Sequence, residues 1–102
     1  MLTDASLPLA ALGDGTRRQV FELLADGPRS VTDLAEQLPV SRPAVSQHLR
    51  VLQDAGLVRF EALGTRRLYR HDPRGLQALR GYVDQFWSDA LGAFAAHLEK
   101  DS

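Results

Sequence analysis

The residues of this chain best suited to a chemical task are hydrogen-bonding side chains in the stretch SRPAVSQHLR, near the middle of the sequence. At about 100° per residue, Gln47 and Arg50 project opposite the apolar Val45 and Leu49, with Ser46 on the flank. Arginine reads guanine, and glutamine reads adenine, through paired hydrogen bonds in the major groove of DNA. The side chains that we expect to contact base edges are therefore Arg42, Ser46 and Gln47. The neighbours that we expect to contact phosphates are Ser41, His48 and Arg50.

A second group of candidate DNA contacts lies further along the chain, where Thr65 precedes Arg66 and Arg67. On either side, LVRFEA and RRLYRH alternate apolar and charged residues, which is typical of the two strands of a β-hairpin. Leu63, Gly64 and Thr65 are predicted to separate the strands. Beside a DNA-binding helix, such a hairpin lies along the backbone or the minor groove. Alternatively, the two arginines are solvated and keep the sheet edge from pairing with other chains.

Two short helices joined by a tight turn are predicted to position the first group. The first helix has a capping pattern at Ser30 and Asp33 and ends at Pro39, and Ser41 is placed to cap the second helix. So short a link makes the helices cross steeply, as in the helix-turn-helix of DNA-binding proteins. The same geometry also fits an ordinary helical hairpin in an all-α core. The residues expected on the buried faces are Leu34, Ala35, Leu38, Val45, Leu49 and Leu52.

One more helix is predicted before this pair, beginning at a cap on Asp14 and running through TRRQVFELLADG to a stop at Gly27. Its inward residues are Val20, Phe21 and Leu24. Arg17 and Arg18 in its first turn are within reach of phosphate, but a solvated turn or a pair with Asp14 is the simpler interpretation.

The last helix is predicted to be the longest, from about 73 to 99, with an apolar stripe too wide for a small domain to cover alone. A second copy of the chain would bury the surplus, because identical subunits pair through the same patch. A short apolar helix over 5–12 needs a packing partner as well. The residues expected in this dimer interface are Leu7, Leu79, Val83, Phe86, Trp87, Ala90 and Phe94.

Length and charge limit the class of protein. At 102 residues the chain is long enough for one domain with a modest core. Its 12 Lys and Arg balance 13 Asp and Glu, which argues against a generic polycation that coats nucleic acid. Residues 41–71 nevertheless hold six arginines against two acids, a net of +4, so with −1 overall the remainder carries −5. A local basic patch suits a protein that touches phosphate on one side.

Several function classes are disfavoured by composition. Without cysteine the chain has no disulfide, thiolate metal site or thiol switch. No apolar run approaches a membrane span and the first residues lack signal-peptide features, so we expect a cytoplasmic protein. No spacing sets up a catalytic group, since Ser46 and His48 are two apart on a helix and point in different directions. We therefore expect neither an enzyme nor a cofactor.

Three motifs in this order, LGDGTRRQVFELL, SRPAVSQHLRVLQDAGLV and GTRRLYR, resemble the ArsR/SmtB family of winged-helix bacterial transcriptional repressors. The resemblance covers roughly residues 9–98. It implies a dimeric repressor that binds an operator in double-stranded DNA, pairs through its terminal helices and is often released by a metal ion or another inducer. Gly15 stands where the family usually has proline, a difference that loosens the start of that helix.

The resemblance also allows metal sensing to be tested residue by residue. The positions that match the thiolates of arsenic-sensing members are Ser30, Thr32 and Ala35, and none supplies a thiolate. The positions that match the ligands of zinc-sensing members are Asp84, Phe86, His97 and Lys100. Two of those four ligands are lost, so we expect no metal site. The sequence identifies no inducer.

We therefore predict an α+β, mostly α, winged helix-turn-helix protein in which residues 1–102 form a single domain. The helix-turn-helix covers about 30–56, the wing about 57–71 and the C-terminal dimerisation helix about 73–99. The predicted partners are operator DNA and a second copy of the chain, with no membrane. The alternative is a winged-helix module that binds protein in place of DNA. Aromatic or aliphatic residues on the free face of the second helix would favour it, whereas Ser46, Gln47 and Arg50 favour DNA.

Overall fold

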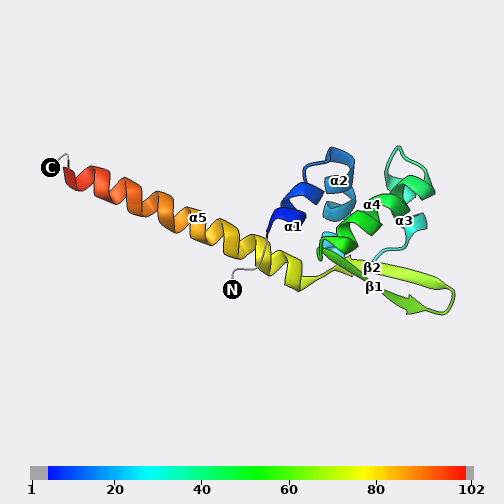
Figure 1. The fold of residues 1–102 in the computed structure, drawn as a ribbon. Coiled ribbons are helices and arrows are strands. Elements are labelled where there is room, and N and C mark those ends of the chain that lie inside the picture. Colours follow the sequence, from blue (N-terminus) through cyan, green and yellow to red (C-terminus); the bar gives the residue numbers. More distant parts are fainter. Residues whose placement is uncertain (1–4, 101–102) are drawn as a thin grey trace.

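The computed structural model describes residues 5–100 and consists of five α-helices, one short 3₁₀ helix and a two-stranded sheet. A body made from the first four α-helices and the hairpin carries the last helix, which projects away from it (Figure 1). This is the predicted winged helix-turn-helix with a long C-terminal helix. The elements in chain order are α1 (Ser6–Ala11), α2 (Gly15–Leu23), η1 (Leu24–Asp26), α3 (Val31–Gln37), α4 (Arg42–Asp54), β1 (Val58–Leu63), β2 (Arg66–His71) and α5 (Pro73–Lys100).

Side-chain caps start three of the helices at the predicted residues. Asp14 accepts a hydrogen bond from the amide of Arg17 at 2.9 Å. The Ser30 hydroxyl accepts from the amide of Asp33, and the Asp33 carboxylate accepts from the amide of Ser30, both at 3.1 Å. Ser41 accepts from the amide of Ala44 at 3.3 Å. Each cap satisfies amides that the first helical turn leaves unpaired.

The core forms around α4, which packs on α2, α3, β1 and α1. The apolar stripe of α4 that the spacing predicts consists of Val45, Leu49 and Leu52, and all three side chains are completely buried. The helix-turn-helix is therefore held by packing on its inner side, and its outer side stays free. The other fully or almost fully buried apolar side chains are Val20, Leu24, Leu34, Leu57 and Val58.

The hairpin has a tighter turn than predicted. Leu63 belongs to β1 and pairs with Arg66, so only Gly64 and Thr65 separate the strands. Gly64 has φ +62°, the left-handed conformation that two-residue hairpin turns require. The prediction that Leu63 lies in the loop is wrong, because backbone pairing extends to a residue whose side chain remains 59% exposed.

The segment 15–27 also differs from the predicted single helix. The α-helix ends at Leu23, and a 3₁₀ turn continues to Asp26 before Gly27, which has φ +140°. The tighter turn still buries Leu24. At the other end of α2, the guanidinium groups of Arg17 and Arg18 donate to the carbonyls of Ala11 and Leu12, at 3.3 and 3.1 Å. These arginines therefore complete the end of α1.

Beyond its first turns α5 packs on no other part of residues 5–100, and its residues 80–100 are exposed. The chain measures 64 × 30 × 21 Å along its principal axes, and α5 accounts for the long dimension (Figure 1). Gly75 and Ala78 are buried, and Leu76 and Leu79 pack on the body. Among residues 5–100, no helix is long and apolar enough to cross a membrane.

Candidate nucleic-acid interface

The outer side of α4 presents the predicted base-reading residues together. Arg42, Ser46 and Gln47 are exposed, as is Arg50 further along the helix. Their inner neighbours are completely buried, so the orientation of this face is fixed by the core. Because the Ser41 hydroxyl already accepts the Ala44 amide, it is left with its proton to donate to a phosphate.

A polar cleft of about 370 Å³ lies between the start of α3, the middle of α4 and the hairpin turn. It brings together four of the predicted site residues from two separate segments of the chain: Ser46, Thr65, Arg66 and Arg67. The hydroxyl groups and guanidinium groups in it are the usual partners of phosphate oxygens. The remaining lining residues are Ser30, Val31, Thr32 and Tyr69.

Arg66 turns back from the hairpin onto the helix-turn-helix. Its Nη2 donates to Oγ of Ser30 at 3.2 Å and lies 3.6 Å from Oδ2 of Asp33. The pKa of the Asp33 carboxyl is lowered by hydrogen bonds from the amide and hydroxyl of Ser30, with a smaller contribution from the charge of Arg66. The Arg66 side chain remains 62% exposed, so it is partly neutralised but still accessible.

Arg67 is held differently, over an aromatic ring. Its guanidinium carbon lies 4.5 Å from the ring centroid of Phe60, which in turn packs against Tyr69 at a centroid distance of 5.5 Å. A cation on a ring face keeps its charge and most of its donors. Arg67 is thus oriented by the sheet and keeps its full charge for an anion.

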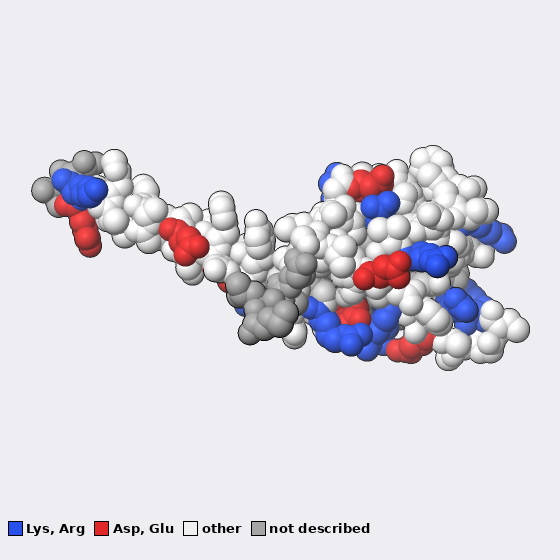
Figure 2. All heavy atoms as spheres, viewed as in Figure 1, with Lys and Arg blue, Asp and Glu red and all other residues white. Residues whose placement is uncertain are grey.

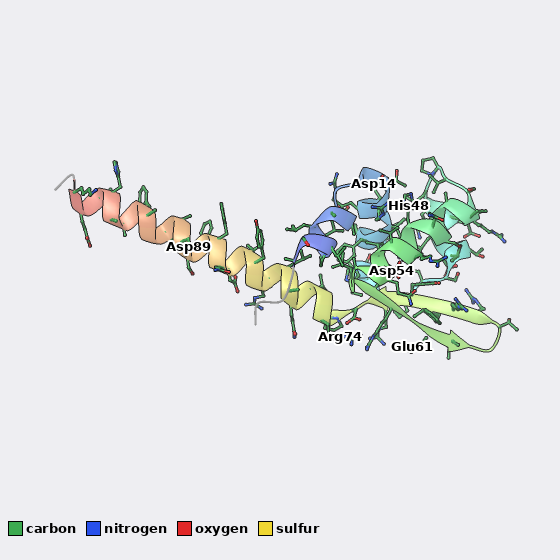
Figure 3. The ribbon with its side chains drawn as sticks, in the orientation of Figure 1. Asp14, His48, Asp54, Glu61, Arg74 and Asp89 are labelled. Carbon is green, nitrogen blue, oxygen red and sulfur yellow. The ribbon has the colours of Figure 1, made fainter. Side chains whose placement is uncertain are left out.

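The two histidines of the body lie apart from this cleft. His48 lies on α4 near Asp14, on the side of the body away from the hairpin (Figure 3). A hydrogen bond from the amide of Arg17 lowers the pKa of the Asp14 carboxyl, with a smaller contribution from the charge of Arg17. His71 donates from Nε2 to the carbonyl oxygen of Phe21 at 2.7 Å. Its imidazole also stacks on the Phe21 ring, with the two ring centroids 4.2 Å apart. The phosphate contact predicted for His48 stays a prediction.

Charge is distributed unevenly over the surface. Lysine and arginine side chains gather over the hairpin and the helix-turn-helix, whereas the part of α5 that projects from the body carries few charges (Figure 2). Two arginines of the hairpin region are engaged with acids, Arg70 with Glu61 at 2.9 Å and Arg74 with Asp72 at 3.0 Å. Positive charge is therefore available mainly around α4 and the hairpin turn.

The residues predicted to form a dimer interface are mostly exposed apolar side chains. Phe86, Trp87 and Phe94 on α5 are 67%, 62% and 60% exposed. Leu7 on α1 and Val83 on α5 are also exposed, as is Ala90. Leu79 differs, since it is half-buried against the body of its own protomer.

No group of three or more His, Cys, Asp or Glu side chains that could hold a metal ion occurs in the described part of the chain. At the positions compared with zinc ligands, Asp84 pairs with Arg80 at 3.7 Å, and the Phe86 side chain has no atom that could bind a metal ion.

Two residues that line the cleft were not among the predicted site residues. Ser30 was considered as a helix cap and Thr32 only as the replacement of a thiolate, yet both line the cleft beside Arg66. The signal that could have found them is their position at the start of the first helix of the motif, which a helix-turn-helix places next to the DNA backbone.

Comparisons with known proteins agree with this architecture. The sequence profile of bacterial regulatory proteins of the arsR family matches residues 14–59. The HTH-type transcriptional regulator Rv2034 of Mycobacterium tuberculosis is 55% identical over 91 residues, which are 89% of this chain and 85% of that protein.

Solved structures are similar as well. A possible transcriptional regulator for arsenical resistance is 46% identical with a TM-score of 0.71, covering 86% of this chain and 92% of that one. The homodimeric winged helix-turn-helix DNA-binding domain Mb0332 of Mycobacterium bovis is 30% identical with a TM-score of 0.67. Its alignment covers 84% of this chain and 80% of that domain.

Proposed function

The chain belongs to the arsR family of bacterial regulatory proteins and is a DNA-binding transcriptional regulator, and on that basis we propose that it acts as a homodimeric repressor of a palindromic operator. The observation that carries this proposal is the exposed face of α4, which combines Arg42, Ser46 and Gln47 beside a cleft with two arginines. We propose no enzymatic step, because the family is one of transcriptional regulators.

In this mechanism α4 enters the major groove. Arg42, Ser46 and Gln47 contact base edges, and Arg and Gln contribute most of the discrimination because each forms paired hydrogen bonds. Ser41, His48 and Arg50 contact phosphates on either side of the helix. The rigid inner packing of α4 supports this role, since base readout requires side chains held in a fixed register.

The wing contributes affinity in place of base readout. Arg67, held over Phe60, and Arg66, held by Ser30 and Asp33, reach the backbone or a narrow minor groove together with Thr65. Ser46 lines the same cleft from α4. One phosphate seated there would be contacted by both the recognition helix and the wing.

The second copy of the chain supplies the symmetry. The exposed stripe of α5, extended by Leu7 of α1, would be covered by the same stripe of a partner. Each fully buried aromatic or aliphatic side chain contributes about 1.5 to 3 kcal/mol. That the similar Mycobacterium bovis domain is homodimeric supports this proposal.

Selection of fragments from random DNA by the purified protein tests the proposed function. We expect enrichment of an inverted repeat with half-site centres about 10 bp apart, or a multiple of that spacing. Enrichment of no sequence would contradict the proposal and favour a protein-binding module.

A further inference from the structure

The first turn of α5 meets the turn that ends α4 without any side chain between them. A Cβ placed on Gly75 would overlap the carbonyl oxygen of Gly56 and lie 2.6 Å from its carbonyl carbon and 3.0 Å from the amide nitrogen of Leu57. Side chains do not approach backbone so closely, and the backbone of a tight turn cannot rotate away. Only glycine at position 75 permits this contact.

On the α4 side of this contact, the turn has a fixed backbone conformation. Gly56 has φ +77°, a conformation that favours glycine, and its amide donates to the carbonyl of Gln53 at 3.0 Å. The next amide, of Leu57, donates to the carbonyl of Leu52 at 2.9 Å, and the Leu57 side chain is completely buried. The end of the recognition helix therefore has one defined conformation.

On the α5 side, hydrogen bonds of Asp72 fix the start of the helix. Asp72 is only 3% exposed. Its amide donates to the carbonyl of Leu57 at 2.9 Å, so the turn after α4 and the start of α5 are hydrogen-bonded to each other. We call this contact between the two helices the joint. The carboxylate of Asp72 accepts from the amide of Arg74 at 3.0 Å, which caps the helix. Figure 3 labels Asp54 on the last turn of α4 and Arg74 on the first turn of α5, on the two sides of this joint.

We propose that Gly75 is a positioning residue, because its contact with Gly56 sets the angle between α4, the helix that enters the major groove, and α5, the helix that pairs with the partner. This angle in turn sets the distance between the two α4 helices of the dimer. The inference rests on the proposed homodimeric DNA binding and adds the element that measures the half-site spacing. Gly75 itself touches neither DNA nor the partner in this account.

The length of α5 makes the angle at its first turn important. A helix of 28 residues is about 42 Å long, so a tilt of about 5° at one end moves the other by about 4 Å. Two-fold symmetry doubles any displacement of one recognition helix. A shift of about 2 Å per protomer therefore changes their separation by about one base-pair step of 3.4 Å.

The test compares Gly75→Ala with Gly81→Ala. Gly81 lies on the same helix, and a Cβ there meets no atom of residues 5–100 within 4 Å, so both variants replace a glycine of α5 by alanine but only Gly75→Ala introduces a clash. The probes are the palindrome selected by the wild-type protein, its single half-site, and palindromes whose spacer is lengthened or shortened by single base pairs.

We expect Gly81→Ala to behave as the wild type on every probe. Gly75→Ala should bind the single half-site within about twofold of the wild type but lose about tenfold to a hundredfold on the wild-type palindrome, because both halves no longer engage together. Its tightest binding should move to another spacer. An unchanged optimal spacer would overturn the inference and leave the proposed function standing, whereas failure of the wild type to select any palindrome would overturn both.

A second measurement needs no substitution at the joint. Because the chain has no cysteine, spin labels can be placed uniquely through Gln53→Cys near the end of α4 and, as a reference, Ser88→Cys on α5, both exposed positions. A stiff joint predicts that the distance distribution across the dimer is no wider for the α4 label than for the α5 label. A clearly wider distribution for the α4 label would overturn the inference even if Gly75→Ala fails to fold.

Discussion

Nη2 of Arg66 donates a hydrogen bond to Oγ of Ser30 at 3.2 Å, which joins the hairpin turn to the cap of a helix 36 positions earlier in the chain. The same hydroxyl accepts the amide of Asp33, whose carboxylate lies 3.6 Å from the guanidinium. The wing and the helix-turn-helix are therefore oriented by one shared group, and the two adjacent arginines of the wing are not equivalent.

This difference predicts unequal salt dependence of DNA binding. Arg67→Ala should lower the slope of log affinity against log salt by about two units, one for each copy in the dimer, because Arg67 lies over the Phe60 ring and no acidic side chain of residues 5–100 forms an ion pair with it. Arg66→Ala should lower it by less, since Asp33 already neutralises part of the charge. Both variants should weaken binding to all sequences.

Fluorescence anisotropy over a range of salt concentrations measures this slope. Arg80→Ala is the matched control, because Arg80 lies on the projecting part of α5 and pairs with Asp84. Retention of the full wild-type slope by Arg67→Ala would show that the wing does not contact phosphate.

The apolar stripe of α5 predicts the oligomeric state. The wild-type protein should sediment as a dimer at micromolar concentration, and Trp87→Glu combined with Phe94→Glu should yield monomers, because both side chains are more than half exposed within one protomer. Gln85→Glu, on the polar side of the same helix, is the control and should remain dimeric. A double variant with the wild-type mass would place the interface elsewhere.

The lowered pKa of the Asp72 carboxyl predicts that the free energy of unfolding falls in acid. Hydrogen bonds from the side chain and the amide of Arg74 lower the pKa of the Asp72 carboxyl, so the ionised form stabilises the fold above the ordinary value of 3.8. That stabilisation is lost as the pH falls through the lowered pKa. Asp72→Asn should therefore reduce the free energy of unfolding by about 1 kcal/mol at neutral pH, and its difference from the wild type should shrink from about pH 5 downward.

Urea unfolding at a series of pH values tests this expectation. Asp84→Asn is the control, because Asp84 is exposed and surface ion pairs contribute little. A difference between Asp72→Asn and the wild type that stays constant into acid would mean that the charge of Asp72 does not stabilise the fold.

The missing ligands predict that metals do not regulate this protein. Ser30, Thr32 and Ala35 supply no thiolate, and Phe86 and Lys100 replace two zinc ligands. Zinc, cadmium and arsenite should therefore leave operator affinity unchanged when titrated into the complex. Tight stoichiometric binding in calorimetry, together with weaker operator binding, would reveal a site built from other residues.

The helix starts and the core of the helix-turn-helix are predictable from sequence because they depend on neighbours within one turn. Ser30, Ser41 and Asp14 each cap a helix through an amide three positions on. The buried stripe of α4 follows from the helical period alone. These are local relationships, so the residue types and their spacing determine them.

The features that sequence reasoning missed depend on contacts between distant segments. Nothing near Arg66 in the sequence indicates Ser30, and nothing near Gly75 indicates Gly56. Leu63 was predicted to lie in the loop because strand assignment followed side-chain alternation, whereas pairing extends to the turn. The predicted contacts of the α4 residues with DNA remain predictions in the same way, since they require a partner outside the chain.

The central claim is that α4 reads base edges, and the binding of Gln47→Ala to selected and unrelated DNA tests it most directly. On the selected palindrome the variant should lose about 1 to 3 kcal/mol for each half-site contact and relax the base preference at one position per half-site. Its affinity for unrelated DNA should stay unchanged, as should the affinity of the control Gln53→Ala, an exposed glutamine near the other end of α4, for both DNAs. Unaltered base preference in Gln47→Ala would contradict the account and place the docking face elsewhere.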